Sequence, residues 1–508
     1  MAIRKGGLRD SAAIISIGEV TPPLLRPVDQ LVVPLRAPPV GTHPTFPIEN
    51  LCFEGGGSKG IAYCGALKVL EDEGIYPTHI HRVAGTSSGG LFATLVAIGF
   101  TADELRDLLY ATDLMALMRD ARFGRLSELI NLFTLYGFNP GFRLMDFLGA
   151  LLDERVGAAD VTFLQLYERC GRELCVTITN ITRMMTEYCH PKTTPDMPVR
   201  LAVAMSMSMP VLMQPYKILR KIGKAGINEE DLYTDGGLLC NYPLHAFDGW
   251  WLSLEPADTF MKRMRPLKDA ARFMHPTERF QPVNNSTLGF TVFANQELDI
   301  TRAWQLPGGG APARPETKLT RKRAAEESVD AERTAMSTAL EAAFEQLVDA
   351  LDEVEQDGDG RVSRREIEGL FDSGRLSSDD AELLFGTASL HDIFTRLDSN
   401  RDGQISYDEL LKFMDTHNLD LTARALGTRR TESSSVTSFM SNILQTMVVQ
   451  IRRSSLVHED RARTVPIDTD YVGTADFDLE DGDRAFLLET GARATRAALQ
   501  RVGQRDAK

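Results

Sequence analysis

Ser87 stands in the pattern GTSSG at residues 85–89, a spacing that can present a nucleophilic hydroxyl. The residues on either side predict a strand over 80–84 and a helix over 90–100. A sharp turn from strand to helix requires glycine on both sides of the serine, because the backbone passes very close to its neighbours there. The pattern also occurs in ordinary Gly-Ser turns, so Ser87 is a candidate nucleophile only if other groups support it.

A second candidate is the glycine-rich stretch GGGSKG at residues 55–60, which follows a short apolar run at 51–53. Its backbone N–H groups and the start of a helix expected over 62–73 are suited to hold developing negative charge. A phosphate-binding loop is the alternative, but Ile61 follows Gly60 where the spacing of such a loop requires lysine. We therefore interpret the stretch as a candidate oxyanion hole.

Asp235 supplies a carboxylate that follows an apolar segment and precedes two glycines, which places it at the predicted end of a strand. Such an Asp-Gly-Gly sequence is most often a simple turn. A free aspartate has a pKa of about 3.9 and is a poor base at neutral pH. Asp235 can therefore activate Ser87 only if it is shielded from water and hydrogen-bonded to the serine.

Taken together and in this order, GGGSKG, GTSSG and DGG resemble the motifs of the patatin-like phospholipase family, which uses a Ser–Asp dyad on a three-layer α/β fold. Further segments are similar to the family as well: 202–210, 241–243, 285–290, 460–467, 474–479 and Gly491 in a closing helix. Because the similar segments lie before and after a long interruption, the resemblance implies that the hydrolase domain resumes near residue 431.

The resemblance also implies roles for single residues. It makes Ser87 the nucleophile and Asp235 the general base. Because nothing near Ser87 in the sequence offers a metal site, we expect no catalytic metal. It assigns the oxyanion hole to the loop at 55–60, mainly through the amides of its second and third residues; the hole residues are Gly55, Gly56 and Gly57, and the supporting residues are Lys59 and Gly60. Lys59 replaces the arginine common in the family, so the positive charge is kept without the planar fork.

Two features leave alternatives open. A histidine after Asp235 in the chain could act as the base of a Ser-His-Asp triad. The candidates are His245, His275 and His458, although the DGG motif favours the dyad.

Four methionines could form an adaptable apolar surface for an acyl chain or simply pack in the core. They are Met205, Met207, Met209 and Met213.

Residues 398–409 match the calcium-binding loop of an EF hand at every ligand position. Oxygen ligands at alternate positions, a glycine at the sixth position and a closing glutamate suit a hard cation such as calcium. The ligands are Asp398, Asn400, Asp402, Gln404, Ser406 and Glu409. An acidic turn on a solvated helix pair is the alternative, and it explains this full pattern poorly.

Residues 355–366 repeat the pattern with a glutamate at the first position, whose longer side chain crowds the loop. We therefore predict a weaker calcium site here, with an acidic turn as a serious alternative. Its ligand positions are Glu355, Asp357, Asp359, Arg361, Ser363 and Glu366. Val362 and Ile405 occupy equivalent loop positions and are expected to pair the two loops as a short sheet.

The sequence predicts four regions: an extended arm at 1–46, a three-layer α/β domain at 47–304 and 431–503, an all-α EF-hand insert with linkers at 305–430, and a tail at 504–508. Two successive strand–helix units indicate a central, mostly parallel sheet. The Gly- and Pro-rich stretch 306–315 marks the start of the insert. After the insert, 436–451 is amphipathic, 463–467 is expected as a strand and 484–502 as a helix.

The 508 residues carry a formal net charge of −15, which disfavours nucleic-acid binding and any general attraction to anionic lipid. Six cysteines without CxxC spacing predict free thiols and folding in a reducing compartment. The apolar segments are too short for a membrane-spanning helix, and no Sec-type signal is evident. We expect a cytoplasmic protein with peripheral membrane contact; non-classical secretion remains open.

The function that the resemblance implies is that of an acyl hydrolase that releases fatty acid from phospholipid or lysophospholipid esters. Calcium is expected to regulate it through the EF-hand module. The expected partners are an acyl-ester lipid at a membrane surface and Ca²⁺, without nucleic acid. The alternatives are a Ser-His-Asp esterase and a calcium-dependent adaptor whose hydrolase domain is inert. No motif reveals the head group, the acyl position or a protein activator.

Overall fold

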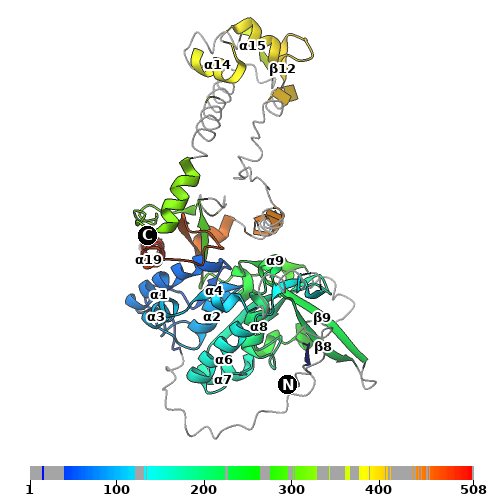
Figure 1. The fold of residues 1–508 in the computed structure, drawn as a ribbon, viewed down its shortest axis with the longest axis vertical. Helices are drawn as coiled ribbons and strands as arrows, with labels where there is room; N and C mark the ends of the chain where they lie inside the picture. Colours follow the sequence, from blue (N-terminus) through cyan, green and yellow to red (C-terminus); the bar gives the residue numbers. More distant parts are fainter. Residues whose placement is uncertain are drawn as a thin grey trace. The chain divides into compact units, whose positions relative to one another are not determined.

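The chain forms two compact units in the computed structural model, one made of Met1–Leu319 with Thr431–Lys508 and the other of Thr320–Arg430 (Figure 1). The candidate catalytic groups all belong to the first unit. The structure describes residues 14–16, 39–120, 131–132, 134–222, 227–263, 275–295, 301, 304–328, 343, 361–365, 377–387, 389–406, 408–409, 412–413, 439, 442–443, 446–447, 449–452, 456 and 458–505.

A mixed sheet forms the centre of the first unit. Its described strands are β1 (Ile14–Ser16), β2 (Asn50–Phe53), β3 (Arg82–Gly85), β5 (Glu173–Asn180), β6 (Met185–Cys189), β8 (Tyr216–Ile222), β9 (Ile227–Asp235), β10 (Thr287–Ala294) and β13 (Thr464–Asp470). Their order is β1-β8-β9-β5-β3-β2-β10-β13, with β6 paired to β5. From β5 to β13 all neighbours run parallel, whereas β9 pairs antiparallel with both β5 and β8. This confirms the expected α/β class with a mostly parallel central sheet.

Strand residues alternate between two apolar cores, one on each face of the sheet. Leu51, Phe53 and Val83 belong to the core that also contains residues of α1 (Ala62–Asp72), α2 (Ser88–Ala97) and α8 (Val199–Ser206). Cys52 and Ala84 belong to the other core, with residues of the segment 240–252. That segment begins at the last residue of α9 (Gly237–Cys240) and includes the 3-10 helix η3 (Leu244–Phe247). The sheet is therefore covered on both faces, as a three-layer arrangement requires.

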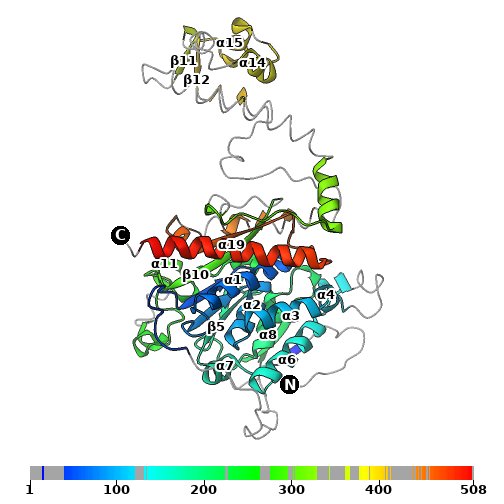
Figure 2. The same ribbon diagram turned by 90° about the vertical axis from the view of Figure 1, so that its left-hand side faces the viewer.

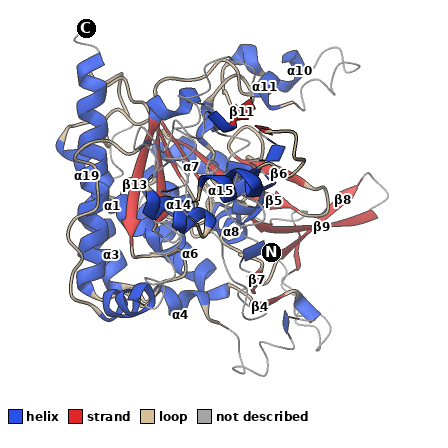
Figure 3. Cartoon of the chain, turned by 90° about the horizontal axis from the view of Figure 1, so that it is seen from above, coloured by secondary structure: helices blue, strands red, loops and turns tan. Residues whose placement is uncertain are grey.

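The chain that returns after the second unit is part of the core of the first unit. Strand β13 pairs with β10, and helix α19 (Asp481–Arg505) packs against α1 and β13 (Figures 2 and 3). A Cβ atom on Gly65 would collide with the Leu488 carbonyl of α19, and one on Gly491 would collide with the Ala62 carbonyl of α1. Glycine at both positions therefore lets the two helix backbones come into contact.

Several elements differ in detail from the sequence expectations. The glycine-rich stretch, expected as a turn, continues into a 3-10 helix, η2 (Gly57–Ile61), in which Lys59 N–H donates to the Gly56 carbonyl at 3.2 Å. Within residues 1–46, β1 pairs in parallel with β8 and extends the sheet. The amphipathic segment expected at 436–451 is described only in part.

Further helices and a separate pair of strands belong to the first unit. Helix α3 (Ala102–Ala111) is capped by Thr101 together with Glu104, whose side chain accepts the Thr101 N–H at 2.8 Å. Other helices of the first unit are α4 (Leu114–Met118), α6 (Phe142–Val156), α7 (Phe163–Cys170), α10 (Phe260–Arg263), α11 (Pro276–Arg279), η4 (Pro256–Asp258) and η7 (His458–Arg463). A separate parallel pair joins β4 (Gly137–Asn139) to β7 (Val211–Met213).

The second unit contains α14 (Ser378–Phe385), α15 (Leu390–Leu397), β11 (Arg361–Ser363) and β12 (Gln404–Ser406). Strands β11 and β12 pair antiparallel with Val362 opposite Ile405. This confirms the expected pairing of the two loops as a short sheet. Across the described parts of both units, no helix has the length and apolar character needed to cross a membrane.

Candidate active site

Ser87 lies in the turn that joins β3 to α2. Its φ of 52° and ψ of −127° form a conformation that residues with a side chain rarely adopt, as in a nucleophile elbow. The turn is so tight that a Cβ atom on Gly85 would collide with the backbone of Gly89. Ser87 N–H donates to Ser206 Oγ at 2.8 Å, and this hydroxyl donates to the Thr177 carbonyl at 2.7 Å. These contacts hold the strained serine in place.

Asp235 ends β9, and its carboxylate faces Ser87. Asp235 Oδ2 accepts a hydrogen bond from Ser87 Oγ at 3.0 Å, and Oδ1 accepts the Gly237 N–H at 2.7 Å. The residue is only 6% exposed, and this burial raises the pKa of Asp235 to about 7 against the opposing effect of the two hydrogen bonds. A carboxylate with this pKa is largely ionised just above neutral pH and can accept the proton of the serine.

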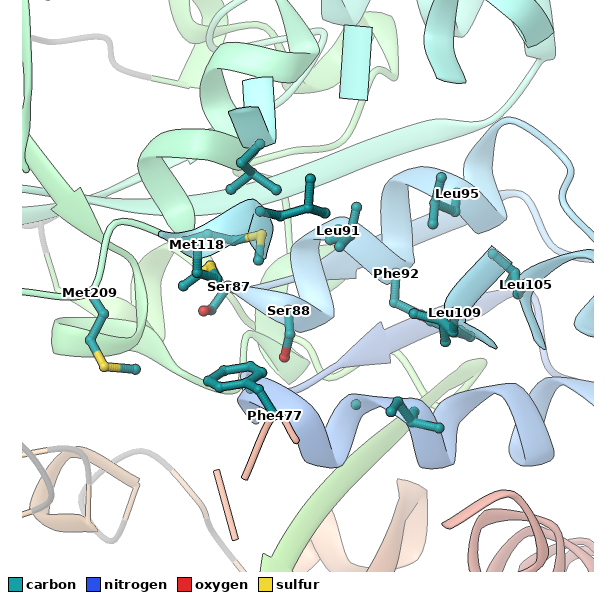
Figure 4. A pocket seen from close by; sticks show the side chains of 16 residues that line it. Ser87, Ser88, Leu91, Phe92, Leu95, Leu105, Leu109, Met118, Met209 and Phe477 are labelled. Carbon is teal, nitrogen blue, oxygen red and sulfur yellow. The ribbon is translucent and has the colours of Figure 1, made fainter. Parts of the chain in front are cut away.

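An apolar pocket opens beside Ser87 (Figure 4). Met207 and Met209 line it, whereas Met205 and Met213 are buried in the protein core. Met207 and Met209 therefore contribute to the apolar surface of the pocket, whereas Met205 and Met213 pack in the core. The other lining residues are Gly57, Gly60, Ile61, Ser87, Ser88, Leu91, Phe92, Leu95, Leu105, Leu109, Leu117, Met118, Leu144 and Phe477. Apart from the two glycines and two serines, these residues have apolar side chains, so the pocket suits an acyl chain.

The glycine-rich loop passes close to Ser87, because a Cβ atom on Gly55 would lie 3.1 Å from Ser87 Cβ. Gly55 N–H donates to the Asn241 carbonyl at 3.0 Å and is therefore engaged within the protein. Gly56 N–H donates to Ser88 Oγ at 3.0 Å, a hydroxyl that a substrate oxygen would have to displace. Gly57 lines the pocket together with Ser87. Gly56 and Gly57 are thus better placed than Gly55 to stabilise an oxyanion.

The residues that support this loop include one that the sequence analysis did not identify, Glu54. Its Oε1 accepts Asn241 Nδ2 at 3.0 Å, and its Oε2 accepts the Val292 N–H at 3.1 Å. Lys59, expected as a supporting residue, is buried and donates from Nζ to the Val292 carbonyl at 3.3 Å. Gly60 packs against Ser88. The sequence signal that could have identified Glu54 is the position of its carboxylate between an apolar strand and three glycines.

The histidines considered for a triad have other surroundings. The His245 ring lies beside the core that contains Cys52 and Ala84, on the face of the sheet opposite to the core that contains residues of α2. There Nε2 is 2.7 Å from Tyr188 Oη, and the ring packs against Phe280. Burial lowers the pKa of His245 to about 4. His275 is exposed and hydrogen-bonded to Thr277. The side chain of His458 lies outside the described part of the structure.

Replacing His275 with alanine is expected to leave ester hydrolysis unchanged, and His245→Asn should retain hydrolysis in whatever fraction of the protein remains folded. The reason is that Asp235 is already hydrogen-bonded to Ser87, so the histidines have no role in proton transfer. Turnover of p-nitrophenyl butyrate, normalised to folded protein by circular dichroism, measures this. Loss of turnover in either folded variant would favour the triad.

The EF-hand loop at 398–409 is described almost completely. Asp398 and Glu409 are buried, and their carboxylates accept hydrogen bonds from loop amides, including Gly403 N–H to Asp398 Oδ2 at 3.0 Å and Ser406 N–H to Glu409 Oε2 at 3.0 Å. The Ser406 amide is the main reason that the pKa of Glu409 is lowered to about 2. Asn400, Asp402 and Gln404 lie along the same loop.

The donor set of this loop consists of oxygens, which fits calcium. Among the described residues, no three His, Cys, Asp or Glu side chains converge as a ready metal site. Because the two buried carboxylates are turned toward loop amides, binding would require these oxygens to exchange partners. Of the loop predicted at 355–366, Arg361 and Ser363 lie in β11, whereas Glu355, Asp357, Asp359 and Glu366 lie outside the described residues.

Comparison with known proteins agrees with this geometry. Residues 51–248 match the family model described as patatin-like phospholipase, and residues 390–414 match the one described as EF hand. The uncharacterized protein YqhO of Bacillus subtilis (strain 168) is 31% identical over 248 residues, which cover 47% of this chain and 76% of that protein. The chain belongs to the patatin-like phospholipase family. Its EF-hand segment lies outside the region that matches the patatin model.

Further relatives of this patatin-like chain come from viruses. An uncharacterized protein of Acanthamoeba polyphaga mimivirus is 31% identical over 201 residues, 40% of this chain and 62% of the relative. A probable lipid hydrolase of Invertebrate iridescent virus 6 is 26% identical over 197 residues, 39% of this chain and 62% of the relative. The match thus spans less than two thirds of each viral protein. Among solved structures, VipD from Legionella pneumophila is 14% identical with a TM-score of 0.38, covering 91% of this chain and 68% of VipD.

Proposed function

We propose that this patatin-like chain is a serine hydrolase that releases fatty acid from phospholipid or lysophospholipid esters. The observation that carries the proposal is the hydrogen bond of 3.0 Å from Ser87 Oγ, which lines the apolar pocket, to the buried Asp235. A nucleophile, a base with a raised pKa and a pocket for hydrocarbon are the parts that acyl-ester hydrolysis requires.

In the proposed mechanism, Ser87 Oγ attacks the ester carbonyl carbon while its proton passes to Asp235 Oδ2. The negative charge that develops on the carbonyl oxygen is stabilised by amides of the glycine-rich loop, after the substrate oxygen replaces Ser88 Oγ on Gly56 N–H. The tetrahedral intermediate collapses, and the leaving alcohol takes the proton from Asp235. Asp235 then accepts a proton from water, which attacks the acyl-serine. Release of the fatty acid returns the proton to Ser87.

The proposed lipid specificity is tested by incubating the purified chain with a mixed phospholipid extract, with and without calcium, and identifying products by mass spectrometry. We expect free fatty acid and the matching deacylated lipid, and neither product with Ser87→Ala. If the folded protein forms no fatty acid at either calcium level, the hydrolase proposal is wrong and a calcium-dependent adaptor with an inert hydrolase domain becomes the better account.

We further propose that calcium regulates the reaction and takes no part in the chemistry. The EF-hand loop belongs to the second unit, which is joined to the catalytic unit through the chain at both of its ends. Calcium binding to sensor EF hands changes the angle between their helices, and such a change can be passed on through two covalent connections. The cytosol is the proposed compartment, with contact at a membrane surface during turnover.

Glu409→Gln is expected to remove the stronger calcium site, because the variant lacks the charged bidentate ligand that closes the loop. Glu366→Gln should remove only the weaker site. Calorimetric titration measures both, with the stronger site expected at about 10⁻⁷ to 10⁻⁵ M. Glu409→Gln should also make the hydrolysis rate insensitive to calcium. Two equal sites, or loss of the stronger one in Glu366→Gln, would contradict the assignment.

A further inference from the structure

Arg452 forms an ion pair with Glu54, a residue very distant in the sequence. Arg452 follows the second unit, which ends at Arg430, whereas Glu54 lies between β2 and the glycine-rich loop. The Glu54 side chain is fully buried, and that of Arg452 is only 12% exposed. Both residues belong to the first unit, so the pair joins the segment after the insert to the residue that precedes the candidate oxyanion hole.

The carboxylate of Glu54 is connected to the glycine-rich loop by two short routes. On one side, Asn241 Nδ2 donates both to Glu54 Oε1 at 3.0 Å and to the Gly55 carbonyl at 2.9 Å. On the other side, Val292 N–H donates to Glu54 Oε2 at 3.1 Å, and the Val292 carbonyl accepts Lys59 Nζ at 3.3 Å. The position of the Glu54 carboxylate therefore affects both ends of the loop.

A fully buried carboxylate keeps its negative charge only where a positive charge and hydrogen bonds replace its lost hydration. Arg452 supplies such a charge in the ion pair. Without it, Glu54 would either take up a proton or turn toward water. A proton on one oxygen removes an acceptor from Asn241 or Val292, and rotation removes both, so either change releases the loop.

We propose that Arg452 is a positioning residue for the oxyanion loop and that it acts through Glu54; the inference rests on the proposed hydrolase function. It also means that the segment following the calcium-binding unit completes the catalytic site. Because the loop stabilises the transition state more than the bound ester, loss of the ion pair should lower kcat and leave KM nearly unchanged.

The test measures kcat and KM for four variants of the full-length protein, with p-nitrophenyl butyrate as the substrate. The variants are Arg452→Met, Arg452→Lys, a double variant that combines Glu54→Gln with Arg452→Met, and Arg493→Met. Arg493 is the matched control, because it also follows the insert but pairs with Glu489 on the surface of α19 and is 42% exposed. We expect Arg452→Met to lower kcat by about 10- to 100-fold, because a misplaced catalytic group can cost about 100-fold and complete loss of an oxyanion donor costs about 100-fold or more. Arg452→Lys and the double variant should recover part of this loss, since neither leaves an uncompensated carboxylate.

The outcomes separate this inference from the proposed function. If the folded wild-type protein is inactive, the hydrolase proposal is wrong, and the inference about Arg452 is wrong as well because it depends on that proposal. If the wild type is active and folded Arg452→Met keeps the wild-type kcat, Arg452 does not position the loop. The same conclusion follows if Arg452→Met has a lowered kcat and neither Arg452→Lys nor the double variant recovers part of the loss. If Arg452→Met does not fold, a folded double variant with lowered kcat and unchanged KM supports the inference. A double variant with normal kcat, or one that also fails to fold, overturns it.

Discussion

Ser87→Ala should lower ester hydrolysis by at least about 10³-fold while the protein remains folded, because the variant has no nucleophile and the rest of the site alone gives only residual catalysis. The substitution removes one oxygen from a half-buried side chain, so circular dichroism and the melting temperature should change little. The strained φ of 52° at this position is held by Ser206 and by the tight turn, neither of which depends on the Ser87 hydroxyl.

The matched control is Ser253→Ala, which removes a hydroxyl from a serine that is not part of the pocket lining. This control should hydrolyse p-nitrophenyl butyrate and phospholipid at the wild-type rate. Wild-type turnover by folded Ser87→Ala would show that another group is the nucleophile.

Asp235→Asn should abolish turnover and at the same time make the protein more stable at alkaline pH. Burial raises the pKa of Asp235 to about 7, compared with about 3.9 for an aspartate in an unfolded chain. The folded protein therefore holds the proton more tightly than the unfolded chain, and ionisation of Asp235 destabilises the fold as the pH rises from about 4 to about 7. The variant avoids this cost, which at pH 8 is at most about 4 kcal/mol.

Melting temperatures measured at pH 5 and pH 8 test this expectation. The variant should gain stability over the wild type at pH 8 and much less at pH 5, where Asp235 is protonated in the folded wild type. For the wild type, kcat/KM should rise with pH through about 7, because the base must be ionised. A rate that falls across this range, or an active Asp235→Asn variant, would exclude Asp235 as the base.

The elements around the site could be predicted from the sequence because each rests on a local pattern. The short apolar runs and glycine turns that contain Ser87 and the 55–60 loop indicated β2, α1, β3 and α2, and the structure has all four. The link between Ser87 and Asp235 required the family resemblance, since nothing local shows that the end of β9 lies beside the turn after β3.

Contacts between distant segments could not be predicted. No local pattern indicates that Arg452 pairs with Glu54, or that Ser206 holds the backbone of Ser87, because both depend on how the strands are ordered in the sheet. The methionines illustrate a second limit: their spacing was compatible with core or pocket, and only the turn after α8 places Met207 and Met209 in the pocket. The pairing of β1 with β8 was also not predicted, because the proline-rich arm that contains β1 has no strand pattern.

The catalytic role of Ser87 is tested most directly by fluorophosphonate labelling followed by peptide mapping with mass spectrometry. An activated serine hydroxyl reacts with this probe, whereas ordinary serines do not. The account predicts that the probe is attached to Ser87 in the wild type, that labelling is lost in Ser87→Ala, and that it slows strongly in Asp235→Asn. A folded wild-type protein that carries no label on Ser87, or carries it on another serine, would contradict the account.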